Sequence, residues 1–167
     1  YHQTLVSGLV STTYQQTDDT SARVAGQSWH THIVCNPYYT FYSTRPGKDR
    51  LNVLSALQNV ESLQYRFNAK TLDLLDKEFK IAAKWRAKVQ SLIEVRGGDV
   101  ELDAVKLNEL FDQWMGTKCI DDRMSICHAS AIVYYRHQTV IPVVKILACD
   151  DAKQFKLLTE HIALCWI

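Results

Sequence analysis

The first 45 residues combine β-branched, aromatic and small polar positions in a pattern that is typical of short strands. Turn residues divide this stretch at Ala25-Gly26-Gln27 and again at Asn36-Pro37. Residues 1–8 give no clear signal. We therefore predict an antiparallel meander of three strands, and the strands are expected at 9–24, 28–35 and 38–44.

Apolar residues recur at helical spacing in the middle of the chain. One such pattern predicts a short helix over 48–58. A longer stripe over 69–95 predicts a single long helix, which ends at Gly97-Gly98. Asp99 is expected to cap the next helix, and a third helix is predicted over 121–135. The apolar stripe of the long helix consists of Leu72, Leu75, Phe79, Ala82, Val89 and Ile93. The stripe of the helix after Asp99 consists of Leu102, Val105, Leu110 and Trp114.

Strand character returns near the end of the chain. Residues 141–149 form a nearly continuous apolar run, which suits a strand that is covered on both faces. A short helix over 152–160 and a further strand over 162–167 are predicted to follow. Such a strand-helix-strand unit places its two strands parallel to each other.

These elements predict an α/β protein with an inserted helical block. Segments 1–60 and 139–167 supply the strand-rich core, and segment 61–138 is the all-helical insertion. A length of 167 residues suits one domain with an inserted subdomain. A chain of this size can bury a core without disulfides or metals.

The composition is that of an ordinary soluble protein, with 47% hydrophobic and 22% charged residues. The formal net charge is +1, so any contact with nucleic acid must come from local basic patches. No apolar run approaches the roughly 20 residues of a membrane span. The absence of an initial Met and the apolar last residues lead us to expect processing boundaries, not natural termini. Five cysteines without a C-x-x-C pair predict reduced thiols in the cytoplasm.

Two acidic pairs are the candidate chemical groups. Asp18-Asp19 lies within the first predicted strand, and Asp150-Asp151 directly follows the buried strand. Carboxylates at strand ends can hold Mg²⁺ or Mn²⁺. The spacing alone leaves alternatives open, because Asp151 can equally cap the following helix. The second pair also fits a receiver-like phosphoacceptor site, although receivers lack an antiparallel meander.

A family resemblance adds to this interpretation. Segment 17–23, followed by a hairpin and then by segment 47–54, resembles the start of the catalytic domain in transposases of the insertion sequence 66 type. Asp150-Asp151 with the following Ala152-Lys153-Gln154-Phe155, and then Cys165-Trp166, is similar to the family's second acidic motif. The resemblance covers residues 12–58 and 140–167 and leaves the helical block unmatched.

The resemblance implies an RNase H-like mixed sheet and DDE-type chemistry. Asp18 and Asp150 are the implied catalytic residues and the ligands of a two-metal site for Mg²⁺ or Mn²⁺. The implied reaction is metal-dependent DNA cleavage and strand transfer, in the bacterial cytoplasm at the nucleoid. The family's third acid has no counterpart, since Glu160 is too close to Asp150, so we expect the chain alone to lack full activity. Transposases of this class generally act as multimers, and transposon ends and target DNA are the implied partners.

Basic side chains could contact phosphate in two places. Four lysines of the predicted long helix fall near one face, although nearby acidic residues favour a merely solvated surface. The basic candidates are Lys48, Arg50, Lys77, Lys80, Lys84 and Lys88. His30 and His32 point the same way on a strand, without an evident third metal ligand. The alternative function is a noncatalytic relic or protein-interaction module with the same fold.

Overall fold

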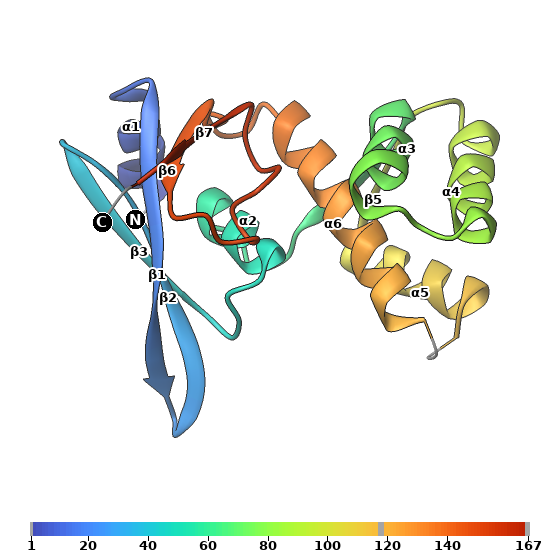
Figure 1. Cartoon of the computed structure of the whole chain (residues 1–167), viewed down its shortest axis with the longest axis horizontal. Coiled ribbons are helices and arrows are strands. Elements are labelled where there is room, and N and C mark those ends of the chain that lie inside the picture. The colour runs from blue at the N-terminus through green and yellow to red at the C-terminus, as the bar shows by residue number, and fades with distance from the viewer. Residues whose placement is uncertain (1, 117–118, 166–167) are drawn as a thin grey trace. The chain divides into compact units, whose positions relative to one another are not determined.

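The computed structural model describes residues 2–116 and 119–165, and it shows a mixed α/β protein that divides into two compact units (Figure 1). Unit 1 comprises residues 1–61 and 138–167, and unit 2 comprises residues 62–137. The elements of unit 1 are α1 (His2–Val10), β1 (Tyr14–Val24), β2 (Gln27–Asn36), β3 (Tyr39–Arg45), α2 (Arg50–Gln58), β6 (Ile146–Cys149) and β7 (His161–Leu164). Those of unit 2 are β4 (Gln64–Phe67), α3 (Ala69–Leu74), the π-helical turn η1 (Leu75–Phe79), α4 (Ala83–Val95), β5 (Val100–Asp103), α5 (Ala104–Trp114) and α6 (Ile120–His137).

Unit 1 is built on a five-stranded mixed sheet in the order β3-β2-β1-β6-β7. The β1–β2 and β2–β3 pairs are antiparallel, and the β1–β6 and β6–β7 pairs are parallel. The predicted meander and the predicted parallel pairing are therefore confirmed, but the strand expected over 141–149 forms only at Ile146–Cys149. The expected start of the first strand at residue 9 is wrong, because residues 2–10 form α1, which buries Leu5 and Leu9. The predicted last two residues of the final strand, Trp166 and Ile167, lie outside the described residues.

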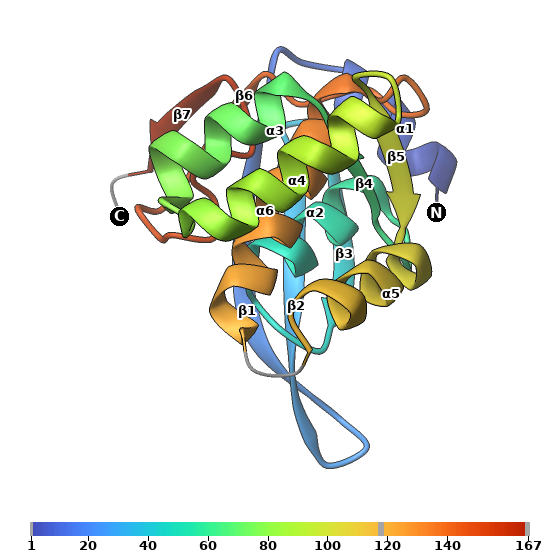
Figure 2. The same ribbon diagram turned by 90° about the vertical axis from the view of Figure 1, so that its right-hand side faces the viewer.

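The β1–β2 hairpin is longer than the rest of the sheet, and its tip extends beyond the other strands (Figure 2). Its turn lies at Ala25 and Gly26, as predicted, with φ angles of 47° and 81°. Two successive positive φ values are the geometry of the two-residue turns that match the twist of antiparallel strands. Gly26 adopts this backbone conformation without the steric cost that Ala25 bears.

The two faces of the sheet differ in what covers them. Along β1, Gln15 and Thr17 are buried, whereas Gln16 and Asp18 are exposed. On the buried face, α1 receives hydrogen bonds from the sheet, since the Gln15 amide donates to the Leu9 carbonyl oxygen and the Asn36 amide donates to that of Gly8. Helix α2 packs against β2 and β3. We call the face with Gln15 and Thr17 the covered face and the face with Gln16 and Asp18 the open face.

The helix predicted over 48–58 is confirmed as α2. Asp49 caps its first turn by accepting hydrogen bonds from the main-chain nitrogens of Leu51 and Asn52.

The helix predicted over 152–160 is wrong, because this segment is a series of turns between β6 and β7. Leu157 has a φ of 69°, which no right-handed helix accommodates. The main-chain oxygens of Lys153 and Lys156 accept hydrogen bonds from the Arg50 side chain, whereas in a helix they would bond to later main-chain nitrogens. Phe155 and Leu158 are buried. We call residues 150–160 the β6–β7 loop.

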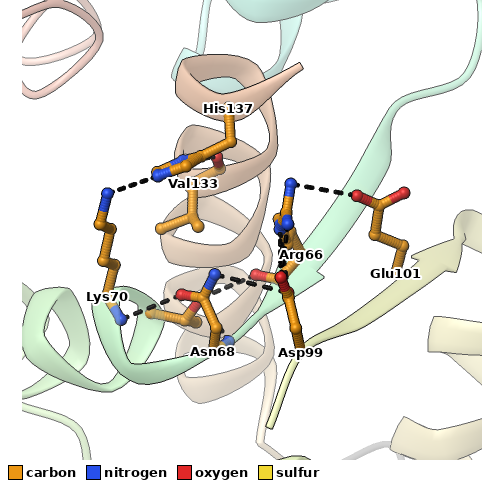
Figure 3. A network of polar contacts seen from close by, with 8 residues as sticks. Arg66, Asn68, Lys70, Asp99, Glu101, Val133 and His137 are labelled. Atoms are coloured by element: carbon orange, nitrogen blue, oxygen red, sulfur yellow. Dashed lines mark hydrogen bonds and ion pairs between the residues drawn. The ribbon is translucent and has the colours of Figure 1, made fainter. Parts of the chain in front are cut away.

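The all-helical insertion predicted over 61–138 is wrong. Unit 2 contains a two-stranded antiparallel sheet of β4 and β5. Arg66 on β4 pairs with Asp99, which lies just before β5, and with Glu101 (Figure 3). The hydrogen bonds from Arg66 lower the pKa of the Asp99 carboxyl. Asp99 therefore joins the two strands and does not cap a helix. The cap of α5 is Asp103, which accepts from the main-chain nitrogen of Lys106.

The apolar stripe expected after Asp99 is also wrong. Val105 is 67% exposed, and the buried residues of α5 are Leu107 and Phe111. The helix was expected to start directly after Asp99, but β5 occupies residues 100–103 and α5 starts only at Ala104. The helix therefore buries a different face from the predicted one.

The single long helix predicted over 69–95 is broken into α3, η1 and α4. The break comes at Lys80, whose φ of 49° lies in the left-handed region. Ala82, expected in the apolar stripe, is exposed, and Trp85 is buried instead. No Gly or Pro marks the break, so tertiary packing overrides local helix preference here. The end of α4 at Gly97-Gly98 is confirmed by φ angles of 84° and 96°.

The third predicted helix is confirmed as α6. It supplies much of the core of unit 2, with Ile126, Ile132 and Tyr135 fully buried. At its last residue, His137 Nδ1 lies 2.8 Å from the Val133 carbonyl oxygen, and Lys70 of α3 contacts His137 Nε2 (Figure 3). None of the helices in the described residues is both long and apolar enough to cross a bilayer.

Candidate active site

Asp18 and Asp150 lie at equivalent positions on neighbouring parallel strands. The β1–β6 ladder pairs Gln16 with Ala148. Continuing that register by two residues places Asp18 beside Asp150, which directly follows β6. Because side chains alternate between the two faces of a strand, Asp18 lies on the open face with Gln16. Strand pairing thus brings together two residues that are far apart in sequence.

Both carboxylates line one cavity of about 220 Å³ in unit 1. The remaining lining residues come from β1, β2, β6 and the segment after β7. They are Gln16, Thr17, Ile33, Cys35, Ala148, Cys149 and Cys165. The cavity is therefore lined by apolar, polar and sulfur-containing residues together with two acidic groups. Carboxylate oxygens are hard ligands of the kind that suits Mg²⁺ or Mn²⁺.

Each carboxylate uses one oxygen in a local hydrogen bond. Asp18 Oδ1 accepts from the main-chain nitrogen of Asp19 at 2.7 Å, and Asp150 Oδ1 accepts from that of Ala152 at 3.0 Å. Within residues 2–116 and 119–165, neither side chain forms an ion pair. Both residues are exposed. In each of the two side chains, this hydrogen bond engages Oδ1 and not Oδ2.

The second acid of each pair has different surroundings. Asp19 is on the covered face, where its Oδ2 accepts a 3.0 Å hydrogen bond from the Gln154 side chain and its Oδ1 is 3.9 Å from His30 Nδ1. Asp151 forms an ion pair of 2.9 Å with Lys156. Both are engaged by protein side chains, whereas the first acid of each pair is not.

A complete metal cage is not formed by these residues alone. In the described part of the chain, no group of three or more His, Cys, Asp or Glu side chains is arranged to hold a metal ion. His30 and His32 do not provide one, since His32 is fully buried and its Nε2 is 2.9 Å from the Gly47 carbonyl oxygen. Asp18 and Asp150 are therefore two carboxylates beside one cavity, without a third His, Cys, Asp or Glu arranged with them among the described residues.

The basic residues fall into two groups. Near the start of α2, Lys48 is exposed, whereas Arg50 is bonded to the β6–β7 loop. In unit 2 the predicted stripe of four lysines on one helix is wrong, because the helix is broken at Lys80. Lys77 precedes the break and pairs with Asp73 at 2.8 Å.

Only two of those lysines share a helix. Lys84 and Lys88 are one turn apart on α4, and both are exposed. The Lys84 ammonium also lies 4.4 Å from the centre of the Trp85 ring. A phosphate-binding role on this helix therefore depends on these two residues.

Sequence reasoning missed the side chains that hold the β6–β7 loop. Gln154 bonds to Asp19 across 135 positions of sequence, and Arg50 bonds to Lys153 across 103. Neither residue type has a local pattern that signals such a contact. The positive charge of Arg50 led to the prediction that it contacts phosphate, whereas its side chain bonds to the main chain of the β6–β7 loop.

Comparison with known proteins identifies one relative. The chain is 30% identical to the uncharacterized protein y4jO of Sinorhizobium fredii over 168 aligned positions, which cover 98% of this chain and 48% of that protein. The chain thus spans about half the length of the curated relative it matches. No protein-family model matches the chain. No solved structure matches it either.

Proposed function

We propose that this chain is part of the catalytic domain of a DDE transposase of the insertion sequence 66 type, with an RNase H-like core. The observation that carries the proposal is the convergence of Asp18 and Asp150 on one cavity. The resemblance named these two residues from separate motifs, and strand pairing brings the motifs side by side. The antiparallel meander extended by parallel strands is the arrangement that the proposed core requires.

In the proposed reaction the two carboxylates hold Mg²⁺ or Mn²⁺ through their unengaged oxygens. Bound metal ions would activate the attacking oxygen and stabilise the leaving oxygen in phosphoryl transfer. Asp18 and Asp150 would hold the metal ions beside the cavity that both residues line. A water molecule would attack a phosphodiester at the transposon end, and the released 3′ hydroxyl would then attack target DNA. The remaining ligands and a third acid would come from beyond these residues.

The test of the metal site is a Mn²⁺ titration of this chain, followed by calorimetry and by paramagnetic broadening of NMR signals. We expect one saturable site that broadens residues around Asp18 and Asp150. Asp18→Asn and Asp150→Asn should each abolish it. Asp151→Asn is the matched control, since that side chain pairs with Lys156, and it should bind Mn²⁺ as the unaltered chain does. Unchanged binding in the first two variants would rule out the proposed site.

DNA is the proposed partner, and exposed lysines of α4 are its proposed contacts. The logarithm of the DNA-binding constant falls linearly with the logarithm of the salt concentration. Neutralising one phosphate-contacting lysine reduces the slope of that line by roughly one unit. Lys84→Gln with Lys88→Gln should therefore weaken DNA binding and flatten its dependence on salt. Lys77→Gln is the control because Lys77 is already paired with Asp73. An unchanged slope in the double variant would show that α4 does not bind DNA.

A further inference from the structure

The two acids of the first pair have separate tasks. Asp18 and Asp19 are adjacent in β1, so their side chains lie on opposite faces of the sheet. Asp18 lines the cavity, whereas Asp19 pairs across the strands with His32 and is half-buried on the covered face. A single metal centre cannot use both side chains without a rearrangement of β1.

The contact that Asp19 does make leads to the β6–β7 loop. Its Oδ2 accepts a hydrogen bond from Gln154 Nε2 at 3.0 Å. Gln154 is four residues after Asp150, and between them the main-chain nitrogen of Ala152 donates to Asp150 Oδ1. A short stretch of chain thus runs from the Asp19 contact to the proposed metal ligand.

Other contacts hold the same loop from different sides. Arg50 donates hydrogen bonds to the main-chain oxygens of Lys153 and Lys156. Phe155, within the loop, is buried. The Asp19 bond differs from these because it originates in β1, the strand that also carries Asp18. It therefore connects the positions of the two proposed ligands.

We infer that Asp19 is a positioning residue, which through Gln154 holds Asp150 in register with Asp18. This inference rests on the proposed metal site and assigns the second acid of the pair a role in placing the site. A hydrogen bond to an ionised carboxylate is stronger than a neutral one, which suits a contact that must restrain a loop. Asp19 acts through the hydrogen bond that its Oδ2 accepts, and an amide oxygen at the same position can accept that bond as well.

Four variants separate this role from metal ligation. Asp19→Asn keeps an acceptor oxygen and removes the charge, whereas Asp19→Ala removes both. Gln154→Ala removes the donor, and the fourth variant combines Asp19→Ala with Gln154→Ala. We expect Asp19→Ala and Gln154→Ala each to weaken Mn²⁺ binding by roughly three- to tenfold, since one charged hydrogen bond is lost in both. Because they delete the same bond, the combined variant should be no weaker than either alone.

Asp19→Asn decides between the two roles. It should bind Mn²⁺ within about twofold of the unaltered chain if Asp19 positions the loop. If Asp19 is itself a ligand, Asp19→Asn will lose binding as fully as Asp18→Asn does, and the inference is wrong. Additive effects of Asp19→Ala and Gln154→Ala would also overturn it.

Amide hydrogen exchange gives a readout that does not depend on metal. Exchange in residues 151–160 should be faster in Asp19→Ala and Gln154→Ala than in the unaltered chain, and it should be unchanged in Asp19→Asn and Asp18→Asn. If the unaltered chain binds no Mn²⁺, the proposed function fails while this measurement still tests the contact. Unchanged exchange in Asp19→Ala would refute the positioning role even where Mn²⁺ binds as proposed.

Discussion

The guanidinium of Arg50 donates a hydrogen bond of 2.8 Å to the main-chain oxygen of Lys153. A second bond of 3.0 Å runs from Arg50 Nε to the main-chain oxygen of Lys156. One side chain at the start of α2 therefore satisfies two carbonyl groups of a loop that has no regular structure of its own. The planar guanidinium can reach both oxygens at once, which the single ammonium of a lysine cannot do with the same geometry.

Replacing Arg50 should destabilise unit 1. We expect Arg50→Ala to lower the free energy of unfolding by about 1–3 kcal/mol, since two charge-assisted bonds are lost. Arg50→Lys should recover only part of that loss. Urea unfolding followed by circular dichroism measures both. Lys48→Ala is the control, because Lys48 is exposed nearby, and equal effects at the two positions would contradict the structural role of Arg50.

Gly8 lies where a side chain does not fit. A Cβ added there would be 2.5 Å from atoms of the Tyr39 ring, whose hydroxyl donates to Gln15 at 2.9 Å. Gly→Ala within a helix normally stabilises it by roughly 0.5–1 kcal/mol. At this position we expect the opposite sign, a loss of about 1–3 kcal/mol from overpacking. Thermal unfolding of Gly8→Ala tests this, with Ser7→Ala in the same helix as the control. A more stable Gly8→Ala protein would show that Tyr39 moves aside freely.

His32 makes the stability of unit 1 depend on pH. It is fully buried, and burial lowers the pKa of its imidazole below the ordinary 6.5, with further lowering from His30 and Arg45. The Asp19 carboxylate and the hydrogen bond to Gly47 oppose this shift. The folded state thus favours neutral His32, so its stabilising contribution is present above pH 6.5 and is lost as pH falls through the lowered pKa.

The variant His32→Gln tests that dependence. Gln keeps a donor for the Gly47 oxygen but does not titrate, so the fall in unfolding free energy between pH 7.5 and pH 5 should become smaller. Urea unfolding at several pH values across this range measures how the unfolding free energy changes with pH. His2→Gln, at an exposed position, should leave the slope unchanged. If His32→Gln has the slope of the unaltered chain, His32 is not the titrating group.

The sequence predicted those parts of the fold that depend on local patterns. The turn at Ala25-Gly26, helix α2 and helix α6 follow from residues close together in the chain. The parallel pairing of β6 and β7 followed from the order of the elements. The helix expected over 152–160 failed because Arg50, about a hundred residues earlier, takes the carbonyl groups that a helix needs.

The helical block shows the same limit. Residues 69–95 have good helix propensity throughout, yet the chain turns at Lys80 so that Leu75 and Trp85 are both buried. For the candidate site, the family resemblance named Asp18 and Asp150, but no local pattern showed that Asp18 and Asp19 have different surroundings. That difference comes from which face of β1 is covered, and only the tertiary structure supplies it.

Cys149 lines the candidate cavity and directly precedes Asp150, so its reactivity reports on the end of β6. It is buried, and burial together with the charges of Asp150 and Asp151 raises the pKa of its thiol to about 11. At pH 8 its thiolate fraction is therefore about a hundredfold below that of an unperturbed thiol, and alkylation requires the thiolate. Iodoacetamide should label the exposed Cys165 first and leave Cys149 protected in the folded chain.

Neutralising the adjacent carboxylate should change that protection in a known direction. Asp150→Asn removes a negative charge, so it should lower the pKa of the Cys149 thiol and speed its alkylation, as measured by mass spectrometry of the labelled peptide. Glu160→Gln, at an exposed position of the same loop, should leave the rate unchanged. Labelling of Cys149 as fast as Cys165 in the unaltered chain would mean that the β6–β7 loop opens readily. Asp150 would then lack the fixed position that metal binding beside Asp18 requires.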